Sequence, residues 1–123
     1  MPFSLTFEIR EGYVLGITTG EEATLDDSLR KIEAVRQRGL EVGLRRFLMD
    51  ERQLAFLLEA HDIALLANRL EERNFQNNGN RVACLYNPEC MQNCKMRETM
   101  YQNRSMNYRI FGDEESAVAW LLR

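Results

Sequence analysis

The feature of this sequence that most constrains its fold is an alternation of short strand-like segments with longer helix-like segments. Residues 4–10 alternate apolar and polar side chains, which is typical of a half-buried β-strand. Residues 13–18 form a second strand-like segment, and only Glu11 and Gly12 separate the two. Strands joined so closely must run antiparallel, so we expect a β-hairpin here.

A helix is expected to follow this hairpin. Thr24 is a favourable N-cap residue, and the acids Asp26 and Asp27 lie in the first turn, where the helix dipole favours negative charge. Apolar residues at helical spacing predict one buried stripe, which consists of Leu25, Leu29, Ile32 and Val35. Gly39 is the expected C-terminal stop.

The rest of the chain repeats strand and helix three times. Strands are expected at residues 44–50, 81–86 and 107–111, and helices at about residues 59–73, 89–103 and 114–122. Residues 50–53 are expected as a polar loop, and residues 54–58 fit either a loop or a short helix. The order ββαβαβαβα predicts an α/β fold with a mixed, mostly parallel five-stranded sheet and helices packed on it, because strand–helix–strand units join parallel strands.

Composition and charge narrow the class of protein. The 123 residues fit one domain of ordinary size, and 45% hydrophobic with 28% charged residues is a globular composition. A net charge of -3, with basic and acidic residues interleaved, argues against nucleic acid as a partner, since phosphate binding requires a basic face. No apolar stretch approaches the ~18 residues of a membrane span and no secretory signal is evident, so we expect a cytoplasmic protein.

Three stretches of the sequence carry a likeness to a known family. They are residues 12–20 (GYVLGITTG), 47–50 (FLMD) and 108–121 (YRIFGDEESAVAWL). They resemble the second strand, the third strand and the C-terminal pattern of the SpoIIAA-like group of uncharacterised bacterial proteins, which have the STAS-domain fold. The resemblance implies a single STAS-like domain over residues 1–123. It also implies a non-enzymatic binding or regulatory module that acts through protein–protein contact.

Two properties associated with that fold do not carry over. STAS antagonists are switched by phosphorylation of a serine just after the third strand, whereas residues 51–53, which follow Asp50, carry no hydroxyl group. No Ser or Thr occurs between Ser28 and Thr99. The group is also compared with lipid-transfer folds, but a chain of this length leaves little room for a lipid-sized cavity in a packed core.

The expected working surface is the carboxyl end of the sheet, where open α/β sheets place their sites. Asp50 and Arg52 are the expected contacts for a protein partner or for a second copy in a homodimer. The candidate surface consists of Thr19, Gly20, Asp50, Glu51, Arg52, Gln53, Asn87 and Asp113. Asp50 has two other interpretations. It could cap the following loop, or it could accept a phosphate as in receiver domains, with Glu21 and Glu22 as the acidic pair but without the lysine that such domains need late in the chain.

Three cysteines support a competing hypothesis. Cys90 and Cys94 lie i,i+4 on one predicted helix, and Cys84 lies on the preceding strand. Together with His61 they are residue types that could coordinate a zinc ion, although their spacing matches no recognised zinc motif. A position near a helix N-terminus would make Cys90 reactive, which favours thiol redox chemistry. The simplest interpretation is three small apolar side chains.

No motif in the sequence names a reaction. We find no nucleophile–base pair and no glycine-rich phosphate loop, so neither an enzyme activity nor a cofactor is expected. A small-anion sensor that uses helix N-termini is a further alternative. The helix at 89–103 is apolar on two sides. One side carries Cys90, Cys94, Arg97 and Tyr101, and the nearly opposite side carries Met96 and Met100 and is a candidate partner surface.

Overall fold

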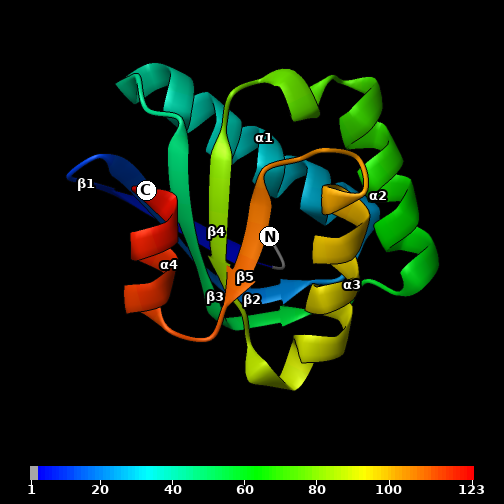
Figure 1. The fold of residues 1–123 in the computed structure, drawn as a ribbon. Helices are drawn as coiled ribbons and strands as arrows, with labels where there is room; N and C mark the ends of the chain where they lie inside the picture. The colour runs from blue at the N-terminus through cyan, green and yellow to red at the C-terminus, as the bar shows by residue number, and fades with distance from the viewer. Residues whose placement is uncertain (1–2) are drawn as a thin grey trace.

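The computed structural model describes residues 3–123, and its elements follow the expected alternation (Figure 1). The strands are β1 (Phe3–Arg10), β2 (Tyr13–Glu22), β3 (Arg46–Phe56), β4 (Arg81–Leu85) and β5 (Tyr108–Phe111). The α-helices are α1 (Leu25–Val42), α2 (Ala60–Glu72), α3 (Met91–Gln102) and α4 (Glu114–Leu121). The short 3₁₀ helices are η1 (Phe75–Asn77) and η2 (Pro88–Cys90).

The strands form one sheet in the order β1-β2-β3-β4-β5. β1 and β2 pair antiparallel, and every other neighbouring pair is parallel. The hairpin turn contains Gly12 with φ of 89°, a left-handed conformation that glycine adopts without strain. The structure confirms the predicted mixed, mostly parallel five-stranded sheet and the order ββαβαβαβα.

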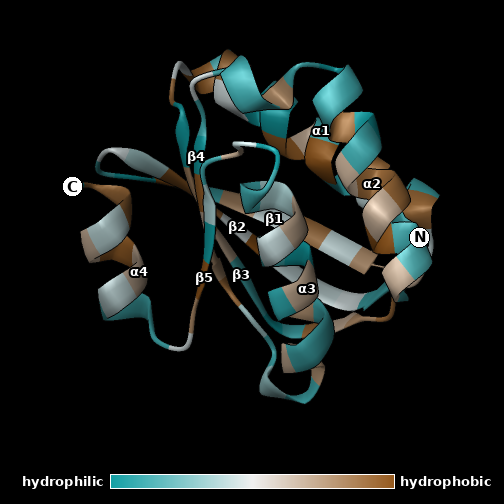
Figure 2. Ribbon diagram, turned by 45° about the vertical axis from the view of Figure 1, so that its right-hand side comes forward, coloured by the Kyte–Doolittle hydropathy of each residue, from teal (hydrophilic) through white to brown (hydrophobic). Residues whose placement is uncertain are grey.

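Helices cover the two faces of the sheet unequally (Figure 2). α4 lies on one face, against β3, β4 and β5, where Leu48 and Leu85 pack with Ala117. We call this side the α4 face. α1, α2 and α3 lie together on the opposite side, where Phe47 packs with Val35 of α1, and we call it the three-helix face.

α1 begins where the sequence predicted but ends later. The Thr24 side chain accepts a hydrogen bond from the Asp27 N–H at 3.1 Å, and the Asp27 carboxylate accepts one from the Thr24 N–H at 3.2 Å, which completes a capping box. The predicted stop at Gly39 is wrong, because the helix continues to a left-handed C-cap at Gly43 (φ 72°). Gly39 instead lies so close to the sheet that an added Cβ would clash with the Phe47 ring and come 2.9 Å from the Leu44 carbonyl oxygen.

β3 is longer than the sequence predicted. Residues 50–53, expected as a polar loop, continue the strand beside β2. Residues 54–56, predicted to be either a loop or a short helix, extend it further. The polar character of residues 50–53 was misleading because half of this strand segment faces solvent.

A β-bulge interrupts the pairing of β2 with β3. Ile17 pairs with Asp50, but Thr19 pairs with Gln53, so β3 carries one extra residue between these pairs. Side chains alternate between faces along a regular strand, and residues three apart would therefore point in opposite directions. The bulge allows Glu51 and Leu54, both buried, to point to the three-helix face together.

Two helices use their apolar residues differently from the prediction. In α1, Leu25, Leu29 and Ile32 of the predicted stripe are half-buried against the core cluster that contains α2. Val35, the fourth residue of the stripe, is buried against the sheet, as are Ser28 and Lys31. In α3, Met96 and Met100 are half-buried against the same cluster. The second apolar side of this helix is therefore packed inside the protein and is not a partner surface.

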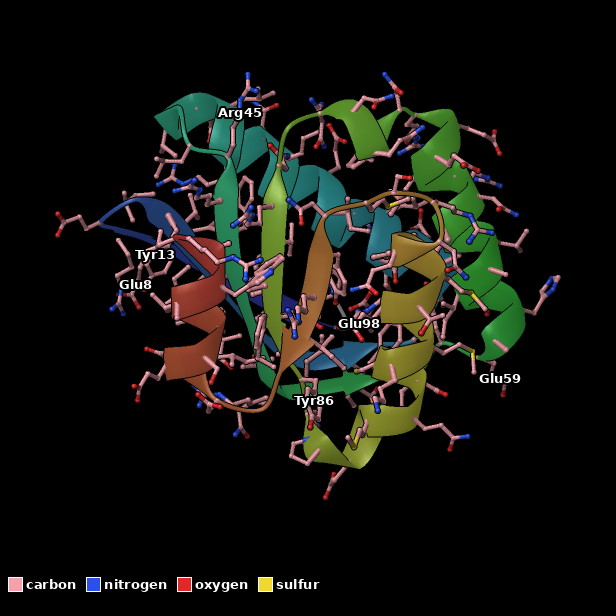
Figure 3. All side chains as sticks on the ribbon, viewed as in Figure 1. Glu8, Tyr13, Arg45, Glu59, Tyr86 and Glu98 are labelled. Carbon is pink, nitrogen blue, oxygen red and sulfur yellow. The ribbon has the colours of Figure 1, made fainter. Side chains whose placement is uncertain are left out.

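The two edges of the sheet differ in their exposure. α3 lies along β5, where Glu98 accepts a hydrogen bond from the Ile110 N–H at 2.7 Å (Figure 3). The Gln102 side chain donates to the Tyr108 carbonyl at 2.9 Å. Side chains of α3 thus form hydrogen bonds with the backbone groups of Tyr108 and Ile110, which lie on the outer side of β5. β1 forms the other edge, and no element within residues 3–123 pairs with its outer side.

Candidate functional site

An exposed charged cluster marks the carboxyl end of the central strands. Asp50 pairs with Leu85, the last residue of β4, and so lies where β4 ends. Its carboxylate accepts two hydrogen bonds from the Arg52 guanidinium, at 2.9 and 2.8 Å, and these bonds hold the pKa of Asp50 below its usual range. Arg52 is 44% exposed and reaches to 3.8 Å from Glu114 of α4. We call Asp50, Arg52 and Glu114 the Arg52 cluster.

Three of the residues predicted for this surface lie beside β3 and the Arg52 cluster. Thr19 and Gln53 are exposed and face each other across the β2–β3 pair. Gly20 follows Thr19 and is also exposed. The candidate surface is therefore continuous along the end of β2 and β3.

Two further predicted residues, Asp113 and Asn87, have structural roles as well. Asp113 is the N-cap of α4, and its carboxylate accepts a hydrogen bond from the Ser116 N–H at 2.8 Å, which lowers the pKa of Asp113. Asn87 is half-buried, and its side chain donates to the Leu54 carbonyl at 3.0 Å while capping η2. Asp113 directly precedes Glu114 of the Arg52 cluster in the sequence. Asn87 instead links η2 to β3 through its hydrogen bond to Leu54.

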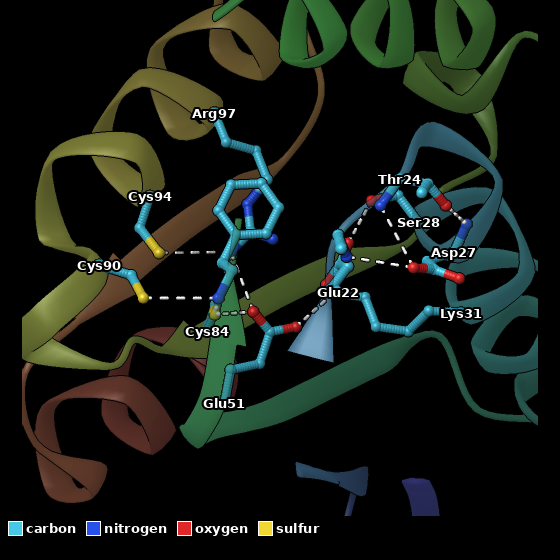
Figure 4. Close-up of polar contacts among 12 residues, drawn as sticks. Glu22, Thr24, Asp27, Ser28, Lys31, Glu51, Cys84, Cys90, Cys94 and Arg97 are labelled. Atoms are coloured by element: carbon cyan, nitrogen blue, oxygen red, sulfur yellow. Dashed lines mark hydrogen bonds and ion pairs between the residues drawn. The ribbon is translucent and has the colours of Figure 1, made fainter. Parts of the chain in front are cut away.

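Glu51, also predicted for this surface, points into the protein instead. It lies on the three-helix face, where one carboxylate oxygen accepts a hydrogen bond from Lys31 Nζ at 2.6 Å and the other from Arg97 Nη2 at 3.0 Å (Figure 4). Its side chain is only 4% exposed. The Glu51 side chain is therefore buried on the three-helix face and cannot contact a partner at the carboxyl end of the sheet.

Glu51 belongs to a buried charge network that the sequence did not reveal. Lys31 Nζ also donates to Glu22 at 2.6 Å, and the Ser28 hydroxyl donates to the second oxygen of Glu22. The Arg97 guanidinium lies 4.2 Å above the centre of the Phe56 ring. We call Glu22, Ser28, Lys31, Glu51 and Arg97 the buried network. It contains two carboxylates and two cations, so its formal charges balance.

Glu51 and Lys31 stay ionised despite their burial. Burial raises the pKa of Glu51, but the charges of Lys31 and Arg97 outweigh this effect and lower the pKa to about 2. Burial likewise lowers the pKa of Lys31, and the carboxylates of Glu22 and Glu51 more than offset it, so that pKa lies above its usual range. Each of these two charged side chains is therefore stabilised by neighbours of opposite charge.

Two of the three cysteines are buried thiols. Burial raises the pKa of Cys84 well above its usual value and that of Cys94 to about 11, so both thiols are protonated at neutral pH. Cys90 is half-buried and accepts a hydrogen bond from the Phe56 N–H at 3.4 Å. His61 is exposed on α2, and residues 3–123 contain no group of three His, Cys, Asp or Glu positioned to hold a metal ion. The geometry does not support the metal hypothesis.

The remaining alternatives also lose support. An anion at the N-terminus of α1 would face the negative charge of Asp27, whose carboxylate already accepts hydrogen bonds from the N–H groups of Ala23 and Thr24, just before the helix. The α4 N-terminus is capped by Asp113 and followed by two further acids. For the receiver interpretation, Glu22 lies on the three-helix face with Lys31, so it does not form an acidic pair beside Asp50.

Comparisons with known proteins identify the fold. No family model matches the chain, and no curated protein matches it. An uncharacterised protein of the DUF3478 family with a SpoIIAA-like fold, from Shewanella loihica PV-4, is similar with a TM-score of 0.58 and 17% identity over 97% of this chain and 93% of that chain. The chain has a STAS/SpoIIAA-like fold.

A second solved structure supports the STAS fold. An anti-sigma factor antagonist from Mycobacterium paratuberculosis is similar with a TM-score of 0.61 and 11% identity, over 98% of this chain and 95% of that chain. The resemblance predicted from residues 12–20, 47–50 and 108–121 is thereby confirmed at the level of the fold. None of the helices in residues 3–123 combines the length and the apolar character needed to cross a membrane.

Proposed function

We propose that this protein is a non-enzymatic regulatory module that binds a protein partner through the carboxyl-end surface of its STAS-like sheet. The surface consists of Thr19, Gly20, Asp50, Arg52, Gln53, Asp113 and Glu114. The observation that carries the proposal is the Arg52 cluster, a charged group that is fixed in orientation and yet exposed. The likeness to an anti-sigma factor antagonist, which is named for acting on another protein, supports the same class of function.

The geometry of Arg52 suits recognition of a protein. Its guanidinium is held by two hydrogen bonds to Asp50, so binding a partner would restrict few additional side-chain rotamers. Arginine is enriched in protein interfaces and among their strongest contacts. Because Asp50 and Glu114 provide negative charge next to Arg52, the surface would select partners that present both signs of charge in a complementary arrangement.

The proposed binding does not depend on a phosphoserine switch. Residues 50–53 of β3 carry no hydroxyl group. Regulation would therefore act through the abundance of the protein or its partner, or through a ligand, and not through phosphorylation at that position.

Site-specific photo-crosslinking tests the proposal. A photoreactive amino acid would replace Gln53 on the proposed surface or Glu72 at the end of α2 as the reference position, in the organism that makes the protein. We expect discrete protein adducts from position 53 only. An adduct of twice the chain mass would identify the partner as a second copy.

A matched pair of arginine variants makes the test specific. Arg52→Ala removes the centre of the Arg52 cluster, while Arg38→Ala removes an arginine of similar exposure that pairs with Glu41 on α1. Adducts at position 53 should disappear with Arg52→Ala and persist with Arg38→Ala. Adducts that survive Arg52→Ala, or that form equally from position 72, would show that the partner binds elsewhere.

A further inference from the structure

A cavity of about 110 Å³ lies between the sheet and the helices of the three-helix face. α1, β3, β4 and α3 contribute to its wall, together with the segment that precedes β5. The carboxyl-end surface lies on the α4 face, so this cavity is a separate feature of the molecule. A ligand could occupy the cavity whether or not a partner binds the carboxyl-end surface.

Apolar side chains form most of the cavity wall. They include Ile32, Val35, Phe47, Leu70, Val82 and Met106. The volume is below the ~300–1,000 Å³ of pockets for drug-sized ligands, and closer to the ~150 Å³ of an apolar cavity that holds benzene. An occupant can therefore be no larger than one ring with a short substituent.

One buried donor in this wall lacks a partner. Arg97 lines the cavity and is 2% exposed, and its Nε–H has no hydrogen-bond acceptor among residues 3–123. The same guanidinium is fixed by Glu51 and by the ring of Phe56. A buried N–H without an acceptor is unfavourable, and an acceptor brought by a ligand would remove that cost.

The charges around the cavity determine the charge of the occupant. Lys31, Glu51 and Arg97 all line it, and Glu22 lies behind Lys31. Arg36 also lines the cavity, but its guanidinium is already paired with Glu33. The other two cations and the two carboxylates balance each other. A carboxylate ligand would add a third negative charge to a buried site, which is unfavourable without a further cation. The fitting occupant is neutral.

We propose that the cavity binds a compact, neutral, mostly apolar molecule whose hydrogen-bond acceptor receives the Arg97 Nε–H. The apolar body would lie against Val35, Phe47 and Val82. The half-buried Asn78 and Asn80 complete the wall at its more exposed side and mark the route of entry.

Methyl NMR spectra of the full chain, titrated with three ring compounds, test the proposal. Phenol and toluene have the same number of heavy atoms, but only phenol carries an oxygen acceptor, and benzoate adds a negative charge. We expect phenol to shift the methyl signals of Ile32, Val35 and Val82, with at least tenfold tighter binding than toluene. Benzoate should not shift them.

Each other result overturns a stated part of the proposal. If none of the compounds shifts these methyl signals, the cavity is not a binding site. If toluene binds as tightly as phenol, Arg97 does not supply the recognition. If benzoate binds most tightly, the conclusion that the ligand is neutral is wrong.

A pair of phenylalanine variants locates the binding. Val82→Phe would fill the cavity and should abolish the phenol shifts, whereas Val118→Phe makes the same change on α4, on the opposite face, and should leave them unchanged. Phenol binding that survives Val82→Phe in a folded protein would place the ligand elsewhere. The three compounds tested on the unmodified protein decide the question even if Val82→Phe does not fold.

Discussion

At the scale of single residues, three consecutive positions of β3 serve two different parts of the molecule. Asp50 and Arg52 form the exposed ion pair on the α4 face, while Glu51 between them anchors the buried network on the other face. Removing one member of a buried ion pair costs more than removing a surface pair, because it leaves an uncompensated charge in a medium of low dielectric constant. Glu51 is therefore the more sensitive position, although Arg52 is the proposed contact.

Replacement of Glu51 should strongly destabilise the protein. Glu51→Gln leaves Lys31 and Arg97 short of one negative charge, and we expect the free energy of unfolding to fall by about 3–5 kcal/mol at neutral pH. Urea denaturation measures this change. Glu33→Gln, which breaks an exposed pair with Arg36, is the control and should cost less than about 1 kcal/mol. Equal losses in the two variants would contradict the importance of the network.

The same residue should make the protein sensitive to acid. The pKa of Glu51 falls from an ordinary 4.5 to about 2 in the folded state, so protonation is easier in the unfolded chain. Its contribution to stability is complete above pH 4.5 and is lost as the pH falls from 4.5 toward 2. The difference in unfolding free energy between wild type and Glu51→Gln should therefore shrink across this range. A difference that does not change with pH would mean that Glu51 is not ionised in the folded protein.

The sequence predicted the exposed part of the site better than the buried part. Asp50 and Arg52 follow an apolar run, and that pattern indicates a strand end at the carboxyl side of a sheet. Lys31 gave a weak signal, since it lies three residues after Ser28 and four before Val35, on the buried side of α1. A lone lysine at such a position normally indicates a solvated helix face. Its two carboxylate partners lie 9 and 20 residues away, on β2 and β3, and no local helical spacing points to them.

At the scale of elements, a glycine within α1 and the glycine that caps it have different structural roles. Gly39 is helical and touches the sheet, whereas Gly43 is left-handed and ends the helix. The sequence pattern predicted a glycine stop but placed it one turn early, because Gly39 and Gly43 both follow the apolar stripe. The bulge of β3 could not be predicted either, since it depends on the pairing of Thr19 with Gln53.

Alanine substitutions should separate these two roles. Gly39→Ala raises helix propensity but forces a Cβ against the Phe47 ring, and we expect a loss of about 1–3 kcal/mol from overpacking. Gly43→Ala has open space around it and should cost about 1–2 kcal/mol, from the left-handed backbone alone. Thermal and urea denaturation measure both changes. A compensating small residue at position 47, as in Phe47→Leu, should recover part of the loss for Gly39→Ala and none for Gly43→Ala.

At the scale of the whole molecule, the sheet is protected on one edge and open on the other. The parallel strands β3 and β4 lie at the centre between helices on both faces, and α3 occupies the outer side of β5. β1 is joined to the sheet only through β2. The stability of the backbone should therefore decrease from the centre of the sheet toward β1.

Amide hydrogen exchange should reveal this gradient. In an antiparallel pair, alternate residues of an edge strand bond to the neighbour and the others point outward. We expect amides of β3 and β4 to exchange only through global unfolding, and β1 to show alternating slow and fast amides. Uniform protection along β1 that increases with protein concentration would instead indicate that two copies pair through this strand.

The unequal edges also limit how copies of this protein could assemble into larger objects. Growth of a filament by strand pairing requires two open sheet edges on every subunit. Here α3 covers the β5 edge, so only the β1 edge is open. If two molecules joined strand to strand at β1, each would cover the other's open end, and growth would stop at a closed pair with twofold symmetry. Although β1 is an unpaired edge strand, the folded protein therefore could not polymerise into a fibre by strand pairing.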